Sequence, residues 1–249
     1  MPDLSWLTAR PVAHRGLHDR DAGRIENSMS AFKAAIERTF AIEVDIQIAE
    51  DGVAMVFHDS ALDRLTEETG LVRSRPGAGL NKIKLSGSND IIPTFDDLLD
   101  EVAGRVPLVI ELKPHGPLTD RLAKTIADRL KRYDGRAVVM SFDPEMIMAV
   151  ARHNPDQLRG ITADATPASA YWEGYTAAQR FSLRHLLHIP RTRPHFIAYD
   201  CKALPAPGPF LWRRIFGCPV LTWTVRDKAE QNRVRKWTDQ IIFEGFDPE

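Results

Sequence analysis

Seven side chains with chemical potential stand at or near the ends of short apolar runs in this sequence. They are His14, Arg15, Glu43, Asp45, His58, Glu111 and Lys113. Carboxylates bind cations, imidazoles transfer protons near neutral pH, and guanidinium and ammonium groups bind phosphate oxygens. The set therefore predicts metal-assisted chemistry on an anion, and a phosphate ester is the substrate class that it favours.

Glu43 and Asp45 alternate with aliphatic residues in the run 42–48. Because successive side chains of a strand point to opposite faces, these two acids share one face. That face is solvated in an ordinary sheet, whereas in a barrel it lies in the lumen, where two like charges need a cation. His14 precedes the pair and His58 follows it, and this neighbourhood favours the barrel.

The three acids Glu43, Asp45 and Glu111 offer only oxygen ligands, with no cysteine nearby. Mg²⁺ or Ca²⁺ prefers such a set, whereas zinc would need His14 or His58 as an additional ligand. The alternative for Glu111 is an ion pair with Lys113, two residues further on the same strand face.

His14 and His58 are candidates for an acid–base pair, in which one ring accepts a proton and the other donates one. Arg15 can hold phosphate oxygens with two parallel hydrogen bonds, and its alternative is a salt bridge to Glu26. Lys113 can place a second positive charge on the same phosphate. The other six histidines carry no comparable context and are assigned no chemistry: His18, His115, His153, His185, His188 and His195.

The elements that must position these residues alternate regularly along the chain. Strands are predicted at 12–13, 42–48, 107–112, 137–140, 158–162, 195–199, 219–224 and 240–243. Helices are predicted at 29–38, 95–102, 118–133, 143–153, 177–187, 209–216 and 228–237. Eight such units in 249 residues predict a single α/β domain over 1–249 with the (β/α)₈ TIM barrel fold.

In that fold the catalytic groups lie at the C-terminal ends of the strands, and the candidate residues are expected there. Trp223 lies at such an end too. Trp223 and Phe142 either wall the pocket or belong to the core. Asp51-Gly52 predicts a hairpin, and the glycine-rich, mixed-charge segment at about 60–92 is interpreted as an insertion without a core of its own.

Composition excludes several functional classes. With 33 basic and 34 acidic residues the net charge is −1, which argues against nucleic-acid binding. Two cysteines make no disulfide framework and indicate a reducing compartment. The N-terminus does not resemble a signal peptide, and no apolar run is long enough to span a membrane. We therefore expect a cytoplasmic protein without stable membrane association.

With these residues placed, the sequence resembles the glycerophosphodiester phosphodiesterase family. The matching motifs are H14-R-G, E26-N-S, E43-V-D, D51-G-V-A-M-V-F-H-D, I92-P-T-F, E111-L-K, S141-F-D-P-E and W223-T-V. The resemblance implies a (β/α)₈ barrel with a small insertion after the second strand. It also implies a divalent metal on Glu43, Asp45 and Glu111, an acid–base pair of His14 and His58, and phosphate binding by Arg15 and Lys113.

Two departures from the family pattern bear on substrate preference. The family often continues after His58-Asp59 with a Thr-Thr pair, where this chain reads R-L-T-E-E-T-G, and it often ends the last strand with Thr-Asp-x-Pro, where this chain reads F-E-G-F-D-P-E. The main hypothesis is a metal-dependent phosphodiesterase that converts small glycerophosphodiesters to glycerol 3-phosphate and an alcohol. The alternatives are phospholipase D-like cleavage of lysophospholipid or sphingomyelin-type substrates, and a barrel that binds a phosphodiester without turnover.

Overall fold

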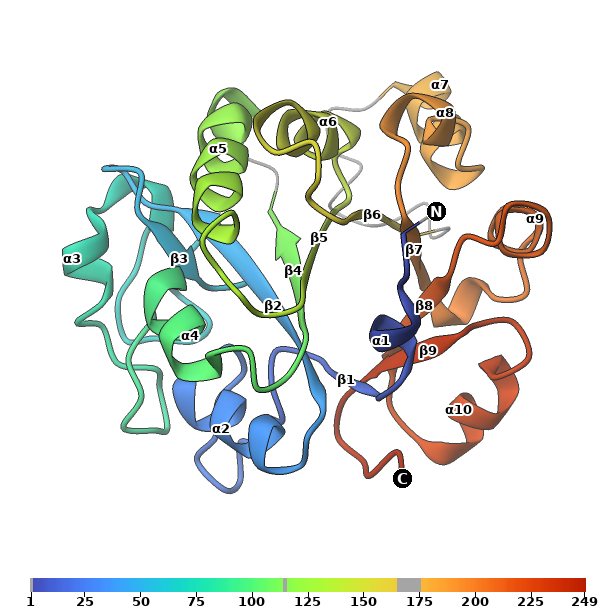
Figure 1. Cartoon of the computed structure of the whole chain (residues 1–249). Helices are drawn as coiled ribbons and strands as arrows, with labels where there is room; N and C mark the ends of the chain where they lie inside the picture. The colour runs from blue at the N-terminus through green and yellow to red at the C-terminus, as the bar shows by residue number, and fades with distance from the viewer. Residues whose placement is uncertain (1, 114–115, 165–175) are drawn as a thin grey trace.

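The computed structural model of the chain describes residues 2–113, 116–164 and 176–249 and shows a closed (β/α)₈ TIM barrel (Figure 1). Its eight parallel strands are β1 (Val12–Ala13), β2 (Ala41–Ile48), β4 (Leu108–Leu112), β5 (Ala137–Ser141), β6 (Arg159–Ala163), β7 (Phe196–Asp200), β8 (Val220–Val225) and β9 (Gln240–Phe243). Each strand pairs with the next, and β1 pairs with both β2 and β9, which closes the ring. The predicted fold class is confirmed, and the eight predicted strands agree with these bounds to within one residue.

Helices surround the barrel on its outer side (Figure 1). Those in the βα units are α2 (Met29–Glu37), α4 (Phe95–Val102), α5 (Thr119–Leu130), α6 (Pro144–His153), α7 (Ala177–Arg184), α9 (Pro207–Phe216) and α10 (Lys228–Val234). Residues 177–187 were predicted to form one helix, but the structure ends α7 at Arg184 and begins a separate short helix, α8 (Ile189–Thr192). Leu186 lies between them with a φ of 58°, which a continuous helix does not allow.

The two faces of β2 pack against different parts of the molecule. Ile42, Val44 and Ile46 belong to the same buried cluster as Phe32 and Ala35 of α2, so they face outward. Glu43 and Asp45 lie on the other face and are about 1% exposed. The predicted placement of the acid pair in a barrel lumen, and not on a solvated sheet, is therefore confirmed.

The end of the barrel opposite the acid pair is filled by apolar side chains. Val109 of β4, Phe196 of β7 and Ile242 of β9 form one buried cluster inside the ring. Leu4 and Leu7 join this cluster from the short helix α1 (Ser5–Thr8), which was not predicted. Helix α1 therefore covers this end of the barrel.

The predicted hairpin at Asp51-Gly52 is present and changes the position of His58. Strand β3 (Ala54–Val56) runs antiparallel to the end of β2, with Ile46 opposite Val56, and has no place in the ring. His58 therefore follows a hairpin strand, and the prediction that both histidines end barrel strands is wrong for it. Glu43 and Asp45 likewise lie in the middle of β2, because its last residues continue beyond the barrel to form the hairpin.

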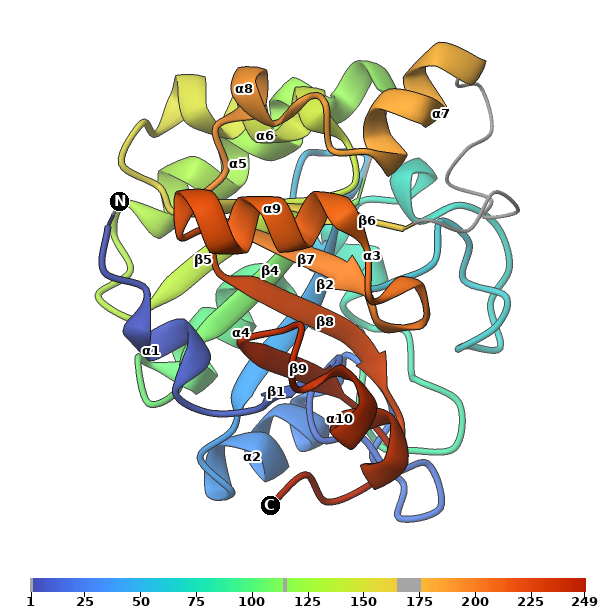
Figure 2. The same ribbon diagram turned by 90° about the vertical axis from the view of Figure 1, so that its right-hand side faces the viewer.

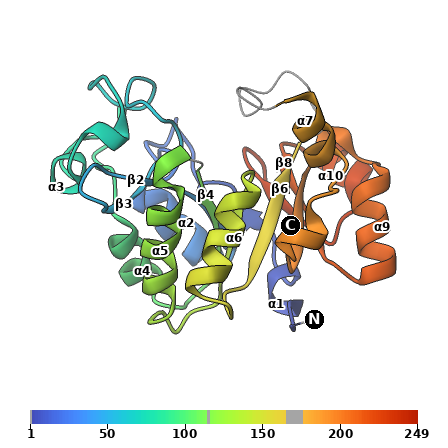
Figure 3. The same ribbon diagram turned by 90° about the horizontal axis from the view of Figure 1, so that it is seen from above.

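Residues 60–92 contain the short helices η1 (Val72–Ser74) and α3 (Gly77–Leu80), and lie on the side of the barrel opposite α9 (Figure 3). The expectation that this segment lacks a core is wrong. Leu62, Val72, Leu80 and Ile92 are buried in a separate cluster with Met55 of the hairpin. The apolar residues of this segment are single and are separated by glycine-rich turns. Because they follow neither the helix nor the strand period, the sequence pattern did not predict that they pack together.

No helix among the described residues is both long and apolar enough to cross a lipid bilayer.

Candidate active site

The turn after β1 fixes His14 and Arg15 at the open end of the barrel. The His14 amide donates a hydrogen bond to the Phe243 carbonyl, 2.9 Å away, so the residue continues the pairing of β1 with β9. Arg15 and Gly16 then take φ angles of 57° and 80°, and a Cβ on Gly16 would lie 2.9 Å from the Ala31 backbone. Only glycine fits there without displacing α2.

Three buried carboxylates form the centre of the site. Glu43, Asp45 and Glu111 each present an oxygen within 4.8 Å of the others, and Asp45 pairs in register with Glu111 on the neighbouring strand. The three carboxyl groups are at most 9% exposed. Three hard oxygen donors in a dry pocket suit a divalent cation, so the residues present fit the metal that the sequence predicts.

The two carboxylates on β2 differ in their electrostatic environment. Burial opposes ionisation of Asp45, but Lys113 and Arg15 outweigh this effect and hold its pKa well below the ordinary value. Burial, together with the negative charges of Asp45 and Glu111, raises the pKa of Glu43 well above the ordinary value. Glu43 is therefore the carboxyl group whose negative charge the neighbouring basic side chains do not compensate. A bound cation would compensate it.

The basic residues of the site contact these acids directly. Lys113 Nζ lies 2.8 Å from Asp45 Oδ1 and also contacts Glu111. The Arg15 amide donates to Glu43 Oε2 at 3.0 Å, and its side chain lies 2.6 Å from Glu26. The ion pairs Arg15–Glu26 and Lys113–Glu111, which the sequence left as alternatives, are thus both present in this structure.

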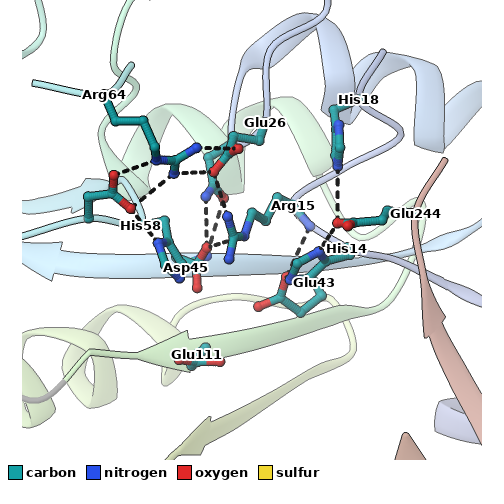
Figure 4. Close-up of polar contacts among 12 residues, drawn as sticks. His14, Arg15, His18, Glu26, Glu43, Asp45, His58, Arg64, Glu111 and Glu244 are labelled. Carbon is teal, nitrogen blue, oxygen red and sulfur yellow. Dashed lines mark hydrogen bonds and ion pairs between the residues drawn. The ribbon is translucent and has the colours of Figure 1, made fainter. Parts of the chain in front are cut away.

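His14 is held by a residue from the far end of the chain. Its Nδ1 lies 2.5 Å from Glu244 Oε2, and its Nε2 lies 3.9 Å from Glu43 Oε2 (Figure 4). Burial, and to a lesser degree the neighbouring Arg15, lowers the pKa of His14 to about 4 against the opposing effect of Glu244. The hydrogen bond from His14 and the nearby His18 side chain hold the pKa of Glu244 well below its ordinary value despite burial. His14 is therefore neutral near pH 7, with its proton on Nδ1 and the lone pair of Nε2 directed into the site.

His58 approaches the carboxylates from the side of the hairpin. Its Nδ1 lies 2.6 Å from Asp59 Oδ1, and its carbonyl accepts a hydrogen bond from Gln47 Nε2 at 2.9 Å. Figure 4 shows His58 beside Asp45 and His14 beside Glu43, so the two rings flank the carboxylates from different sides. With Nδ1 bound to Asp59, Nε2 is the nitrogen that can exchange a proton with a ligand.

Arg64, from the insertion, joins the two sides of the site. Its guanidinium donates to both oxygens of Asp59, at 2.6 and 3.0 Å, and to both oxygens of Glu26, at 2.9 and 2.8 Å. Asp59 holds His58 and Glu26 holds Arg15, so one side chain supports both (Figure 4). Burial opposes ionisation of Glu26, but Arg64 and Arg15 lower its pKa to about 2.

The site thus contains residues that the sequence interpretation missed. Glu244 directly follows the last predicted strand, the same signal that marked His14, and could have been found by that rule. Asn27, whose side chain donates to Asp45 Oδ2 at 2.8 Å, entered the sequence analysis only as part of the motif E26-N-S. His18 was assigned no chemistry, yet its Nε2 lies 3.5 Å from Glu244 Oε2. His115, also assigned none, lies outside the described residues.

Trp223 lies in β8 at the open half of the barrel. Its ring packs edge-on against Phe142, with 5.5 Å between centroids. Its indole N–H is buried, and no hydrogen-bond acceptor for it occurs in the described parts of the chain. A buried donor without a partner is unusual and is suited to a ligand oxygen.

The chain matches the family model described as the glycerophosphoryl diester phosphodiesterase family over residues 14–244. This match extends from the first candidate histidine to Glu244. The chain belongs to that family. The family resemblance predicted from the sequence motifs is therefore confirmed.

Proteins with related sequences carry the corresponding name. Glycerophosphodiester phosphodiesterase 1 of Bos taurus is 30% identical over 148 residues, which are 55% of this chain and 43% of that protein. Glycerophosphodiester phosphodiesterase of Caldanaerobacter subterraneus is 29% identical over 163 residues, 60% of this chain and 65% of its own length. The matched regions thus span only about half to two thirds of these relatives.

Two solved structures show the same fold. A phosphodiesterase of Oleispira antarctica, in complex with the product sn-glycerol-3-phosphate, aligns with a TM-score of 0.78 at 20% identity. The alignment covers 94% of this chain and 92% of that one. The Thermotoga maritima glycerophosphodiester phosphodiesterase aligns with a TM-score of 0.72 at 21% identity, covering 94% of each chain.

Proposed function

We propose that this protein is a metal-dependent phosphodiesterase that hydrolyses glycerophosphodiesters to glycerol 3-phosphate and an alcohol. The observation that carries the proposal is the buried group of Glu43, Asp45 and Glu111 flanked by two histidines. A site that only binds a phosphodiester needs positively charged groups for the phosphate. It needs neither three buried carboxylates nor two oriented imidazoles. Family membership and the product complex of the Oleispira antarctica neighbour support the same substrate class.

Glu43, Asp45 and Glu111 would hold the metal, for which Mg²⁺ or Ca²⁺ suits an all-oxygen set. When bound, such an ion polarises phosphoryl oxygens and lowers the pKa of a coordinated hydroxyl group. The raised pKa of Glu43 supports this assignment, because a carboxyl group that is hard to ionise without a cation gains most from one.

Arg15 and Lys113 would bind the phosphate. The Arg15 Nε lies 3.1 Å from Asp45 Oδ2 but without hydrogen-bond geometry, so this buried N–H has no acceptor among the described residues. Lys113 is 6% exposed and contacts two of the proposed metal ligands. A metal cation bound by those carboxylates would weaken their ion pairs with Arg15 and Lys113. The two basic side chains could then bind phosphate oxygens. Trp223 would donate its unpaired indole N–H to another substrate oxygen.

His14 would act as the base and His58 as the acid. His14 is neutral near pH 7 and presents Nε2, which would remove a proton from the attacking hydroxyl. Where that hydroxyl belongs to the glycerol of the substrate, water would then open the resulting cyclic phosphate to give glycerol 3-phosphate. His58 would deliver a proton from Nε2 to the departing alkoxide while Asp59 holds its other nitrogen. The two rings flank the carboxylates from different sides, as attack on and departure from one phosphorus require.

The test is incubation of the purified protein with glycerophosphocholine, glycerophosphoethanolamine and glycerophosphoglycerol, each with Mg²⁺ or Ca²⁺. The expected result is release of glycerol 3-phosphate, measured enzymatically, which stops when EDTA is added. Glu43→Gln should abolish turnover, whereas Glu37→Gln on the exposed side of α2 should leave it unchanged. If substrate binds in calorimetry but no glycerol 3-phosphate is released with either metal, the barrel is a binding protein and the proposal fails.

A further inference from the structure

One face of the molecule combines exposed apolar side chains with a strong excess of positive charge. Among the described residues, the six most exposed large hydrophobic side chains all lie between 181 and 216: Phe181, Leu187, Phe210, Leu211, Ile215 and Phe216. Their exposed fractions run from 46% to 65%, while no other large hydrophobic side chain described exceeds 37%. We call the surface formed by α7 and α9 the α7/α9 face.

The two helices of this face lie beside each other. A side chain on Gly208 of α9 would come within 3.3 Å of Leu186, which follows α7. Figure 2 looks onto α9 along its whole length, with α7 next to it. The two helices therefore lie on one side of the molecule, remote from the insertion around α3 (Figure 3).

Helix α9 is oriented with an apolar stripe toward solvent. Pro209 is its buried residue, and Arg213 on the inner side pairs with Asp239 at 2.8 Å. At 100° per residue, Phe210, Leu211 and Ile215 then fall together on the outer side with Arg214 among them. This is the reverse of the usual orientation, in which a surface helix turns its apolar stripe to the core.

The charge of this segment differs from that of the chain as a whole. Residues 176–217 contain a single acid, Asp200, which is buried, and seven basic residues: Arg180, Arg184, Arg191, Arg193, Lys202, Arg213 and Arg214. Two of them form ion pairs with acids outside the segment, Arg191 with Glu145 and Arg213 with Asp239. The segment thus carries a formal charge of +6 in a chain whose total is −1.

We propose that the α7/α9 face docks reversibly onto an anionic lipid surface. A basic helix with an exposed apolar stripe lies in the plane of a membrane interface, with aliphatic and aromatic side chains among the acyl chains and arginines at the phosphates. A second copy of the chain is the less suitable occupant, because a two-fold symmetric contact would bring this basic face, which includes Arg184 and Arg214, against the same basic face of the other copy. Such docking modifies the expectation that membranes play no part and is independent of the proposed catalytic activity.

The test is co-sedimentation of the full chain with vesicles of phosphatidylcholine, with or without phosphatidylglycerol, at low and physiological salt. Wild type should bind the anionic vesicles and lose binding as salt rises. Leu211→Ser/Ile215→Ser should lower the partition coefficient at least ~10-fold, since two aliphatic side chains no longer enter the bilayer. Arg184→Gln/Arg214→Gln should also lower the partition coefficient at least ~10-fold, because each arginine near an anionic surface contributes about fivefold.

The matched control is Arg73→Gln/Arg132→Gln, which removes the same charge from exposed positions outside the face and should change binding by less than ~2-fold. Thermal melting and turnover of glycerophosphocholine verify that each variant is folded, since none of these residues lies in the site. Failure of wild type to bind anionic vesicles at low salt overturns the proposal, as does equal binding by the Leu211→Ser/Ile215→Ser variant. A wild-type dimer in light scattering that this variant dissociates would assign the face to a second copy instead.

Discussion

The carboxylate of Glu244 lies 2.5 Å from Nδ1 of His14, although 230 residues separate the two in sequence. The closure of the barrel makes this contact, because β1 and β9 are neighbours and each of the two residues directly follows one of these strands. The hydrogen bond fixes which ring nitrogen carries the proton and leaves Nε2 free to act as a base. His14 therefore depends for its orientation on the last strand of the chain.

Glu244→Ala should lower kcat/KM by ~10- to 100-fold, because His14 loses the acceptor that fixes its tautomer. The loss should not exceed the whole contribution of general-base catalysis, which is roughly 10²–10⁴-fold. Glu244→Gln should recover part of the loss, since its amide oxygen still accepts from Nδ1. The measurement is steady-state turnover of glycerophosphocholine. Asp247→Asn, three residues further in the same exposed segment, is the control and should behave as wild type. Full activity in Glu244→Ala would show that His14 needs no positioning.

Arg64→Ala should reduce kcat/KM at least ~10-fold with only a small loss of stability, because partly exposed ion pairs contribute about 1 kcal/mol or less. Lys at this position cannot donate to four oxygens at once, so Arg64→Lys should resemble alanine. Guanidinium added at millimolar concentration should restore part of the activity of Arg64→Ala. Arg75→Ala, which removes another ion-paired arginine of the insertion, is the control. Loss of activity in step with loss of folded protein would contradict a positioning role.

Glu43→Gln and Asp45→Asn should change the metal-free protein in opposite directions. Glu43 is a buried carboxyl group with a raised pKa, so its replacement by a neutral isostere should leave stability unchanged or increase it. Asp45 compensates the charges of Lys113 and Arg15, so its loss should cost about 3 kcal/mol or more. Urea unfolding in EDTA measures both. Either variant should also lose the rise in Tm that Mg²⁺ or Ca²⁺ is expected to give wild type.

Glu26 should make the stability of the protein depend on pH in the acid range. Its folded pKa of about 2 lies below the ordinary value of 4.5, so its ionised form stabilises the fold. This contribution is fully present above pH 4.5 and is lost as the pH falls toward 2. The difference in unfolding free energy between wild type and Glu26→Gln should be about 1–2 kcal/mol at neutral pH, because solvent screens the partly exposed pair with Arg64, and it should shrink across this window. A difference that stays constant down to the lowest pH at which the protein remains folded would contradict the assignment.

The two histidines should respond differently to the leaving group. His58→Ala should be slow on substrates that release an alkoxide, but should recover substantially on a nitrophenyl phosphodiester, whose phenolate departs without a proton. His14→Ala should be slow on both, since the nucleophile still needs activation. His153→Ala, far from the site on α6, is the control. Recovery of His14→Ala alone would reverse the two roles, and near-wild-type rates in both variants would remove acid–base catalysis from the proposal.

The sequence predicts those parts of the site that local periodicity controls. Glu43 and Asp45 could be assigned to one face because aliphatic residues alternate with them, and the burial of that face followed from eight repeating units. Arg64 could not be assigned, because it lies in a segment without helix or strand period and its two acceptors come from different loops. The outward orientation of α9 was equally hidden, since Phe210, Leu211 and Ile215 form the same stripe whether it faces the core or the solvent.

The hairpin of β2 and β3 separates the two proposed proton-transfer groups mechanically. His14 is attached to a ring of strands that is hydrogen-bonded all the way round, whereas His58 is attached to an edge strand and to the small cluster of the insertion. Changes in residues 65–92 could therefore reshape the wall on the proposed side of the departing alcohol without moving a barrel strand. If the proposed roles hold, substrate range could vary in evolution independently of the phosphate chemistry, with Arg64 as the contact that joins the two parts.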